Sequence, residues 1–210
     1  MLNRHNLNIA KLASKEGSRF TLNAIFVTQT DTVETDGSQL VVVSRPKMGD
    51  TTEVPEDYPD QPVETHAALL LPASDAAKIQ SALKNGNNAE ICASETQGDS
   101  RIVPVVTADN DSAQTHRVRV PSGNFPDYQR VIPPASKNTF KITLNAKLVK
   151  DLMAQFETFT KTQMNPAVEF YFFGETNSVR MDADGGNDQH MTAVLMPMKG
   201  DFLQAKREAE

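Results

Sequence analysis

The sequence contains no tryptophan and only one cysteine, Cys92, among its 210 residues. A single cysteine excludes an intrachain disulfide and any zinc site that needs a cysteine pair. Cys92 lies in the apolar stretch 89–93, which favours a buried strand thiol over a nucleophile. This sparing use of cysteine is typical of the reducing cytoplasm.

Long apolar runs are missing as well. The longest, Ala67 to Ala73, is far shorter than the roughly 20 residues that cross a bilayer. The first five residues contain no apolar core of a secretory signal. Residues 1–15 contain no acid, which leaves a transit peptide as an alternative, but a short basic helix explains them better. We therefore expect a cytoplasmic protein with no membrane partner.

The sequence also lacks a recognisable catalytic set. None of its histidines, His5, His66, His116 and His190, has a second ligand at metal spacing. No glycine-rich phosphate loop is present. We therefore predict that the protein is not an enzyme and needs no metal or cofactor.

One acidic segment, 182–188, superficially resembles a calcium loop. With Asp182 as the first loop position, the twelfth is Ala193, where such a loop needs glutamate. We interpret the segment as a polar hairpin connection, and residues 109–111 as a loop of the same kind. A cation-dependent enzyme that uses Asp182, Asp184 and Asp188 remains an alternative.

The residues that are present form a repeated pattern. Three successive units share one order of predicted elements. The second unit, in which the order is clear, begins with strand 67–71 and continues with a helix that starts at Ser74 and ends at Gly86. Strands 89–93, 102–107 and 115–120 follow. The third runs from strand 140–144 through a helix that Asn145 caps, to strands 168–173, 178–181 and 192–197. The first is a reduced version, with helix 8–16 and strands 20–27, 32–35 and 40–43. A repeated β-α-β-β-β unit predicts an α+β array with helices on one face of continuous antiparallel sheets.

Domain boundaries follow from this pattern. The proline- and acid-rich stretch 49–65 has no periodicity and serves as a linker. We predict half-modules at 1–48, 66–134 and 135–200, and a charged tail at 201–210.

The net charge of −6 argues by itself against a nucleic-acid partner. The basic residues nevertheless gather on the predicted helices, whereas the linker and loops hold much of the acid. This distribution predicts either helices that face phosphates or ordinary lysine decoration of solvated helix faces. The candidate DNA-facing residues are Lys11, Lys15, Arg19, Lys78, Lys84, Lys147 and Lys150, with Lys161 at the end of the last helix.

Three segments resemble the bacterial DNA sliding-clamp family, the DNA polymerase III beta subunits. Residues 19–25 and 34–40 are similar to the family's strand and its Ala-Thr-Asp-Gly-His-Arg-Leu turn, with Ser38-Gln39 in place of His-Arg. Residues 125–133, Phe-Pro-Asp-Tyr-Gln-Arg-Val-Ile-Pro, closely match the family's Phe-Pro-Asp-Tyr-Arg-Arg-Val-Leu-Pro. Residues 193–199 resemble the family's Val-Val-Met-Pro-Met-Arg terminus. The shared order of the segments is more specific than any one of them.

The resemblance implies a non-enzymatic processivity factor. In the family these segments line one hydrophobic cleft that captures peptides of polymerases, clamp loaders and repair proteins. Methionine suits such a cleft because it is flexible and polarizable. Packing of Met196 and Met198 in a core is the alternative. When the family's cleft positions are transferred to the matching positions of this sequence, the resemblance implies the following cleft residues: Leu22, Thr35, Gly37, Leu40, Pro126, Arg130, Val131, Met196, Pro197 and Met198.

The resemblance also implies a ring around duplex DNA. Family rings contain twelve half-domain units, so three units per chain predict a homotetramer. Compared with the family, the first domain and the first half of the last domain are missing. A clamp-fold adaptor or decoy, which binds replication-protein peptides without encircling DNA, is therefore the alternative function.

Overall fold

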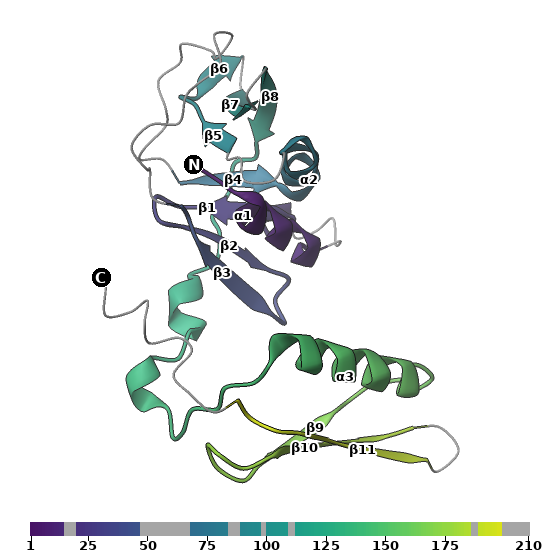
Figure 1. Ribbon diagram of the computed structural model, residues 1–210. Helices are drawn as coiled ribbons and strands as arrows, with labels where there is room; N and C mark the ends of the chain where they lie inside the picture. Colours follow the sequence, from purple (N-terminus) through teal and green to yellow (C-terminus); the bar gives the residue numbers. More distant parts are fainter. Residues whose placement is uncertain are drawn as a thin grey trace. The chain divides into compact units, whose positions relative to one another are not determined.

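The structure is a computed structural model that describes residues 1–14, 20–46, 68–83, 89–97, 100–108, 112–185 and 189–198. The chain forms two compact units, Met1–Ile132 and Pro133–Glu210 (Figure 1). Every strand pair in the described ranges is antiparallel. Together with the helices this makes an α+β protein, as the sequence predicts.

The first helix begins earlier than predicted. Helix α1 (Arg4–Asn8) continues as the 3-10 helix η1 (Ile9–Leu12), whereas the pattern predicts a helix over 8–16. The Asn3 side chain accepts hydrogen bonds from the backbone of His5 and Asn6, and the Asn6 side chain accepts one from the Asn3 backbone. This reciprocal cap fixes the start of α1.

The first sheet has the strand order β3-β2-β1-β4, from β1 (Ala24–Val27), β2 (Asp31–Thr35), β3 (Leu40–Ser44) and β4 (Leu69–Pro72). The predicted strand 20–27 is wrong in its first half, because residues 20–22 form the 3-10 helix η2 (Phe20–Leu22). Asn6 ties the first helix to this sheet. Its amide donates to Thr32 Oγ1 at 3.0 Å and to the Ser44 carbonyl at 3.1 Å.

Helix α2 (Ala73–Ala82) follows β4 directly. The predicted cap at Ser74 is wrong, because Pro72 holds the N-cap position and makes no side-chain hydrogen bond there. The helix also ends before the predicted Gly86, since Leu83 is already extended. Gln80 donates to the Arg4 carbonyl and to Asn8 Oδ1, so α2 and α1 lie side by side.

The second sheet is built around the long strand β7 (Ser100–Ala108), which pairs along its length with β8 (Ala113–Val120). The short strands β5 (Ala89–Ile91) and β6 (Glu95–Gln97) share the other edge of β7. Pro104 lies between the two pairings, and its carbonyl accepts from Cys92 N at 2.9 Å. A proline cannot donate to a ladder, so the paired edge breaks where Pro104 faces it.

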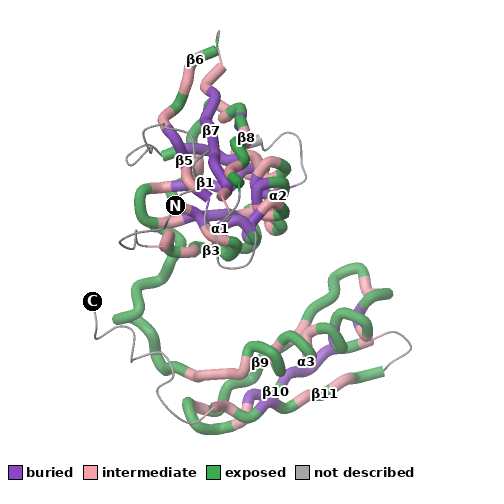
Figure 2. Tube along the Cα trace, turned by 45° about the horizontal axis from the view of Figure 1, so that its top comes forward, coloured by how far each residue is buried: buried purple, intermediate pink, exposed green. Residues whose placement is uncertain are grey.

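One hydrophobic core joins both sheets and both helices of the first unit. It includes Leu7, Ile25, Leu71, Ile79 and Val103, each almost fully buried. Buried positions gather along β1, β5, β7 and α2 (Figure 2).

The second unit is smaller. Helix α3 (Ala146–Phe159) packs on a sheet of order β11-β10-β9, from β9 (Glu169–Phe172), β10 (Val179–Asp184) and β11 (His190–Leu195). The predicted cap is confirmed, because the Asn145 side chain accepts from Lys147 N and Leu148 N. The predicted strand 140–144 is wrong, because these residues form no strand, although Lys141 N donates to Glu175 Oε1 at 3.3 Å and the Thr143 carbonyl accepts from Met198 N at 2.8 Å. Two short 3-10 helices, η3 (Tyr128–Val131) and η4 (Ala135–Lys137), lie between the last strand of the first unit and α3.

Candidate functional site

The turn between β2 and β3 is held by its own side chains. Asp36 accepts from Ser38 N at 2.8 Å and from Gln39 N at 3.0 Å, and these hydrogen bonds lower the pKa of its carboxyl. Gly37 has φ of 96°, a conformation that glycine adopts without strain. Thr35 Oγ1 donates to the Gln39 carbonyl at 2.6 Å. The Thr-Asp-Gly segment therefore forms a rigid corner.

An aromatic contact anchors the segment that follows β8. The rings of Phe26 and Phe125 are stacked, with centroids 5.0 Å apart and planes 7° apart. Tyr128 meets the edge of the same Phe26 ring at 6.4 Å. Stacked and edge-to-face pairs of this kind add about 0.5–1.5 kcal/mol beyond the burial of area. Phe26 thus holds residues 125–128 against the first sheet.

The strand register places two predicted cleft residues, Thr35 and Leu40, on the same sheet face as Phe26. Phe26 pairs with Val33 in β2, and Val33 pairs with Val42 in β3. Thr35 and its partner Leu40 lie two residues along from these, so they point to the same face. The core residues Ile25 and Val41 point to the opposite face. Thr35 and Leu40 therefore face the side that residues 125–128 cover in part.

The remaining predicted residues of the first unit are mostly exposed. Leu22 is half-buried at the end of η2, and Pro126 is exposed. Val131 has 68% of its surface accessible. Arg130 makes an ion pair with Asp127, at 2.7 Å from Nε to Oδ2, on the surface. Pro126, Arg130 and Val131 are therefore accessible to a ligand.

Met196, Pro197 and Met198 belong to the second unit, just beyond β11. Met196 is 65% exposed, so it does not pack in a core. Met198 is half-buried, and its backbone is fixed by the bond to Thr143. The structure describes these residues only within their own unit.

The predicted DNA-facing residues are exposed where the structure describes them. Lys11 lies on η1, Lys78 on α2, and Lys147 and Lys150 on α3. Lys78 pairs with Asp75 at 2.9 Å, and exposed pairs of this kind add little stability. Lys15, Arg19 and Lys84 lie outside the described residues.

The acids of segment 182–188 have other partners. Asp182 is buried and accepts from Arg180, with Nη2 to Oδ2 at 2.7 Å, which lowers the pKa of its carboxyl. Asp184 contacts His190 Nδ1 at 2.7 Å. Both belong to strand β10, so the predicted hairpin connection starts later, at Gly185. Asp188 lies outside the described residues. Within the described ranges, no group of three His, Cys, Asp or Glu is placed to hold a metal ion.

Cys92 is 1% exposed, as the sequence predicts. Burial raises the pKa of its thiol, which lowers the population of the reactive thiolate. Among the residues that the structure describes, no helix is long and apolar enough to cross a membrane.

Two residues that matter here are not singled out by the sequence. Phe26 is the residue against which residues 125–128 pack. In the sequence, only its position in the alternating pattern of β1 indicates this role. Glu34 is fully buried in β2, next to Thr35, and no sequence pattern announces a buried acid there.

The antiparallel sheets and the repeated order of elements define a DNA sliding-clamp fold. Over 94% of its length the chain matches a DNA polymerase sliding clamp from Bacillus subtilis, with a TM-score of 0.65 and 15% identity, and it covers 48% of that chain. It also matches the DNA polymerase III beta subunit from Thermotoga maritima over 94% of its length, with a TM-score of 0.63 and 19% identity, and covers 48% of that chain.

A third match is the sliding clamp from Bartonella birtlesii bound to griselimycin. The TM-score is 0.60 and the identity 18%, over 94% of this chain and 49% of that one. This chain therefore spans about half the length of the clamps it matches. No protein-family model and no curated protein matches the sequence. At these identities the comparison establishes the fold, and it confirms the fold that the sequence predicts.

Proposed function

We propose that the protein is a DNA sliding clamp, a processivity factor that tethers replication proteins to duplex DNA. The observation that carries the proposal is the sliding-clamp fold over nearly the whole chain. The clamp itself makes and breaks no bond. It raises the local concentration of a polymerase that is bound to it.

Peptide capture is assigned to the predicted cleft residues. In the first unit Thr35 and Leu40 share a sheet face with Phe26. Val131 has an exposed apolar side chain and follows closely in sequence after residues 125–128, which Phe26 anchors. In the second unit Met196 is exposed and flexible enough to adapt to different ligands. Arg130 would fix a polar group of the peptide.

DNA binding is assigned to the helix lysines, including Lys11, Lys78, Lys147 and Lys150. These side chains are exposed and long, so they would contact phosphates loosely and without sequence preference. Such contacts allow sliding. Three half-modules per chain would need four chains to complete a ring of twelve.

A clamp-fold adaptor or decoy is the second candidate. It would keep the peptide cleft without encircling DNA. The observation that favours it is the length, since the chain spans about half of the clamps it matches.

We predict that the chain binds griselimycin, the compound present in the Bartonella clamp structure. Changing Val131 to aspartate should weaken binding by at least 10-fold, because a charge would lie on an apolar binding surface. Isothermal titration calorimetry with the full chain measures the change. The matched control is Met164→Asp, an exposed apolar residue between α3 and β9 that belongs to none of the three segments assigned to the cleft. Equal weakening in both variants, or none in either, would contradict the assignment of the cleft.

The ring and the adaptor differ in solution mass. Light scattering over a range of protein concentrations should give a stable mass near four chains if the protein closes a ring alone. A monomer at every concentration would exclude the self-assembled ring and favour the adaptor, whatever the griselimycin result.

A further inference from the structure

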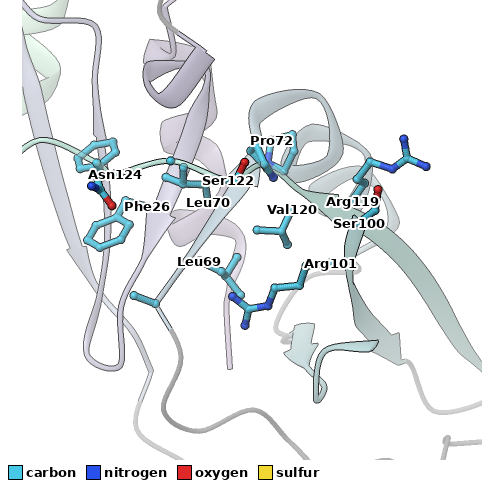
Figure 3. Close-up of a pocket in the computed structure, with 14 residues that line it drawn as sticks. Phe26, Leu69, Leu70, Pro72, Ser100, Arg101, Arg119, Val120, Ser122 and Asn124 are labelled. Carbon is cyan, nitrogen blue, oxygen red and sulfur yellow. The ribbon is translucent and has the colours of Figure 1, made fainter. Parts of the chain in front are cut away.

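In the first unit, the chain before each α-helix pairs with the sheet that follows the other helix. Strand β4 leads into α2 and pairs with β1, the first strand after α1, so Leu70 lies opposite Phe26 in the wall of a pocket (Figure 3). Leu2 precedes α1 and meets Ala89 of β5, the first strand after α2, through two hydrogen bonds of 2.7 Å. The exchange therefore runs in both directions.

This exchange covers the core side of β1. Ile25 and Val27 of β1 face the core and pair with Leu71 and Leu69 of β4. All four side chains are almost fully buried. The strand that leads into α2 thus closes the core beside the first strand after α1.

Among the described residues, the second unit has one α-helix and lacks this exchange. No described strand pairs with the outer edge of β9, the first strand after α3. Phe170 and Phe172 of β9 pair with Met181 and Val179 of β10, which belong to the core, so both rings lie on the core face of the sheet. They are nevertheless 42% and 45% exposed. The core is therefore open at the edge where β4 closes it in the first unit.

The chain that leads into α3 has the apolar pattern of β4. Ile142 and Leu144 have the same spacing as Leu69 and Leu71, and in each segment the second residue lies two positions before the helix. Ile142 and Leu144 are only partly buried in their own unit. Their segment therefore has the residues of a strand that covers a core, without a strand to pair with among the described residues.

Within one chain, residues 140–144 lie across the end of the sheet instead of along its edge. The Thr143 carbonyl accepts from Met198 N, beyond the end of β11, and Lys141 N donates to Glu175 in the turn between β9 and β10. Both places lie at the same end of the sheet. The chain thus carries a strand-like segment and an open sheet edge that do not pair with each other.

We propose that two copies of the chain exchange these segments. Residues 140–144 of each copy pair antiparallel with the outer edge of β9 in the other copy, with Leu144 opposite Phe170 and Ile142 opposite Phe172. The two pairings are related by a two-fold axis, so one self-complementary surface satisfies both open elements of both chains. Burial of the exposed rings drives the association. A second copy is the partner because each chain carries both halves of the exchange, and the pairing requires neither DNA nor a bound peptide.

A disulfide between two different variants tests the contact, because this register places Thr143 opposite Tyr171. Chains with Thr143→Cys are mixed with chains with Tyr171→Cys, oxidised and separated on a non-reducing gel. The mixture should give at least 10-fold more covalent dimer than either variant alone, since the natural Cys92 is buried. The matched control is a mixture of Thr158→Cys and Tyr171→Cys, because Thr158 is an exposed threonine of α3 outside the exchanged segment.

Hydrogen exchange of the natural chain gives a second readout. Peptides that contain residues 140–144 and 169–172 should exchange more slowly at high protein concentration than at low, whereas peptides from β1 and β4, which already pair within one chain, should not change. Exchange that is independent of concentration in a chain that stays monomeric would overturn the proposal. A yield of covalent dimer no higher than in the control mixture would also overturn it.

The outcomes separate this contact from the proposed ring. A mass near four chains without the disulfide between positions 143 and 171 would keep the ring and reject the strand exchange. A disulfide-linked dimer that never reaches four chains would keep the exchange and reject the self-assembled ring. Griselimycin binding tests the predicted cleft and decides neither.

Discussion

Replacing Phe156 with alanine is expected to unfold the second unit while the first unit stays folded. Phe156 is 1% exposed and is the largest fully buried side chain among the described residues. The core around it has only four other buried members, Val179, Met181, Ala183 and Leu195. Truncating a buried phenylalanine costs about 3–5 kcal/mol. A unit of this size has little stability to lose, because small cores bury too little surface.

Hydrogen exchange with mass spectrometry resolves the two units. In the variant, peptides from α3 and β10 should lose protection, whereas peptides from β1 and β7 should keep it. Leu148→Ala is the control, because Leu148 lies on the same helix with 48% of its surface exposed. Loss of protection in both units together would contradict the prediction and show that they fold as one block.

The sequence predicts elements well where local chemistry decides the structure. Helix α3 has its apolar stripe and its Asn145 cap, and both are confirmed. The Asp36-Gly37 turn is likewise confirmed between β2 and β3. In each case neighbouring residues supply the hydrogen bonds, so a short window of sequence contains the information.

The sequence-based predictions fail where contacts with distant segments decide the local structure. Strand β6 is polar, and it forms because the edge of β7 beyond Pro104 is open to it. Residues 140–144 are predicted as a strand, but among the described residues no strand pairs with them, and their backbone bonds at Lys141 and Thr143 do not form a ladder. The capping of α1 uses Asn6 where a glutamate or glutamine is the usual signal, so the pattern places that helix too late.

The candidate site, too, could be predicted from the sequence only in part. The residue segments that resemble sliding clamps identify candidate positions, and the structure adds the shared sheet face of Thr35 and Leu40. The anchoring role of Phe26 could not be predicted, because it depends on a ring more than ninety residues away in the chain. The predicted half-module boundaries and the cleft itself stay predictions.

The second large effect is expected at Glu34, where substitution should stabilise the first unit. Glu34 is fully buried in β2, and its Oε2 has no hydrogen-bond partner in the described structure. Its Oε1 accepts only from Thr35 N at 3.2 Å. Burial raises the pKa of the carboxyl from 4.5 to about 8, and the nearby Asp36 adds to the shift. A buried acid without a partner persists by holding its proton.

The sign of the pH dependence follows from this raised pKa. Below pH 4.5 the carboxyl is protonated in both the folded and the unfolded chain, so its titration does not change the free energy of unfolding. Between pH 4.5 and about 8 the unfolded chain releases the proton and the folded chain keeps it, so stability falls as the pH rises. Above about pH 8 the cost is constant and reaches roughly 5 kcal/mol at most, from about 1.4 kcal/mol for each pKa unit between 4.5 and about 8.

Glu34→Gln removes this titration, so its advantage over the natural chain should grow from near zero at pH 5 to a few kcal/mol at pH 9. Urea unfolding at each pH measures the difference. The Met1 amino group has a pKa lowered to about 6, mainly by burial, and it acts in the opposite direction between pH 6 and 8. That contribution is common to both proteins and cancels in the difference. Glu157→Gln, on the exposed face of α3, is the charge-matched control.

A second variant separates charge from hydrogen bonding. Glu34→Leu fills a similar volume without polar atoms, so it should stabilise the unit at pH 9 at least as much as the glutamine does. If both variants unfold more readily than the natural chain at pH 9, the folded structure stabilises the Glu34 carboxylate, and the predicted pH dependence is wrong.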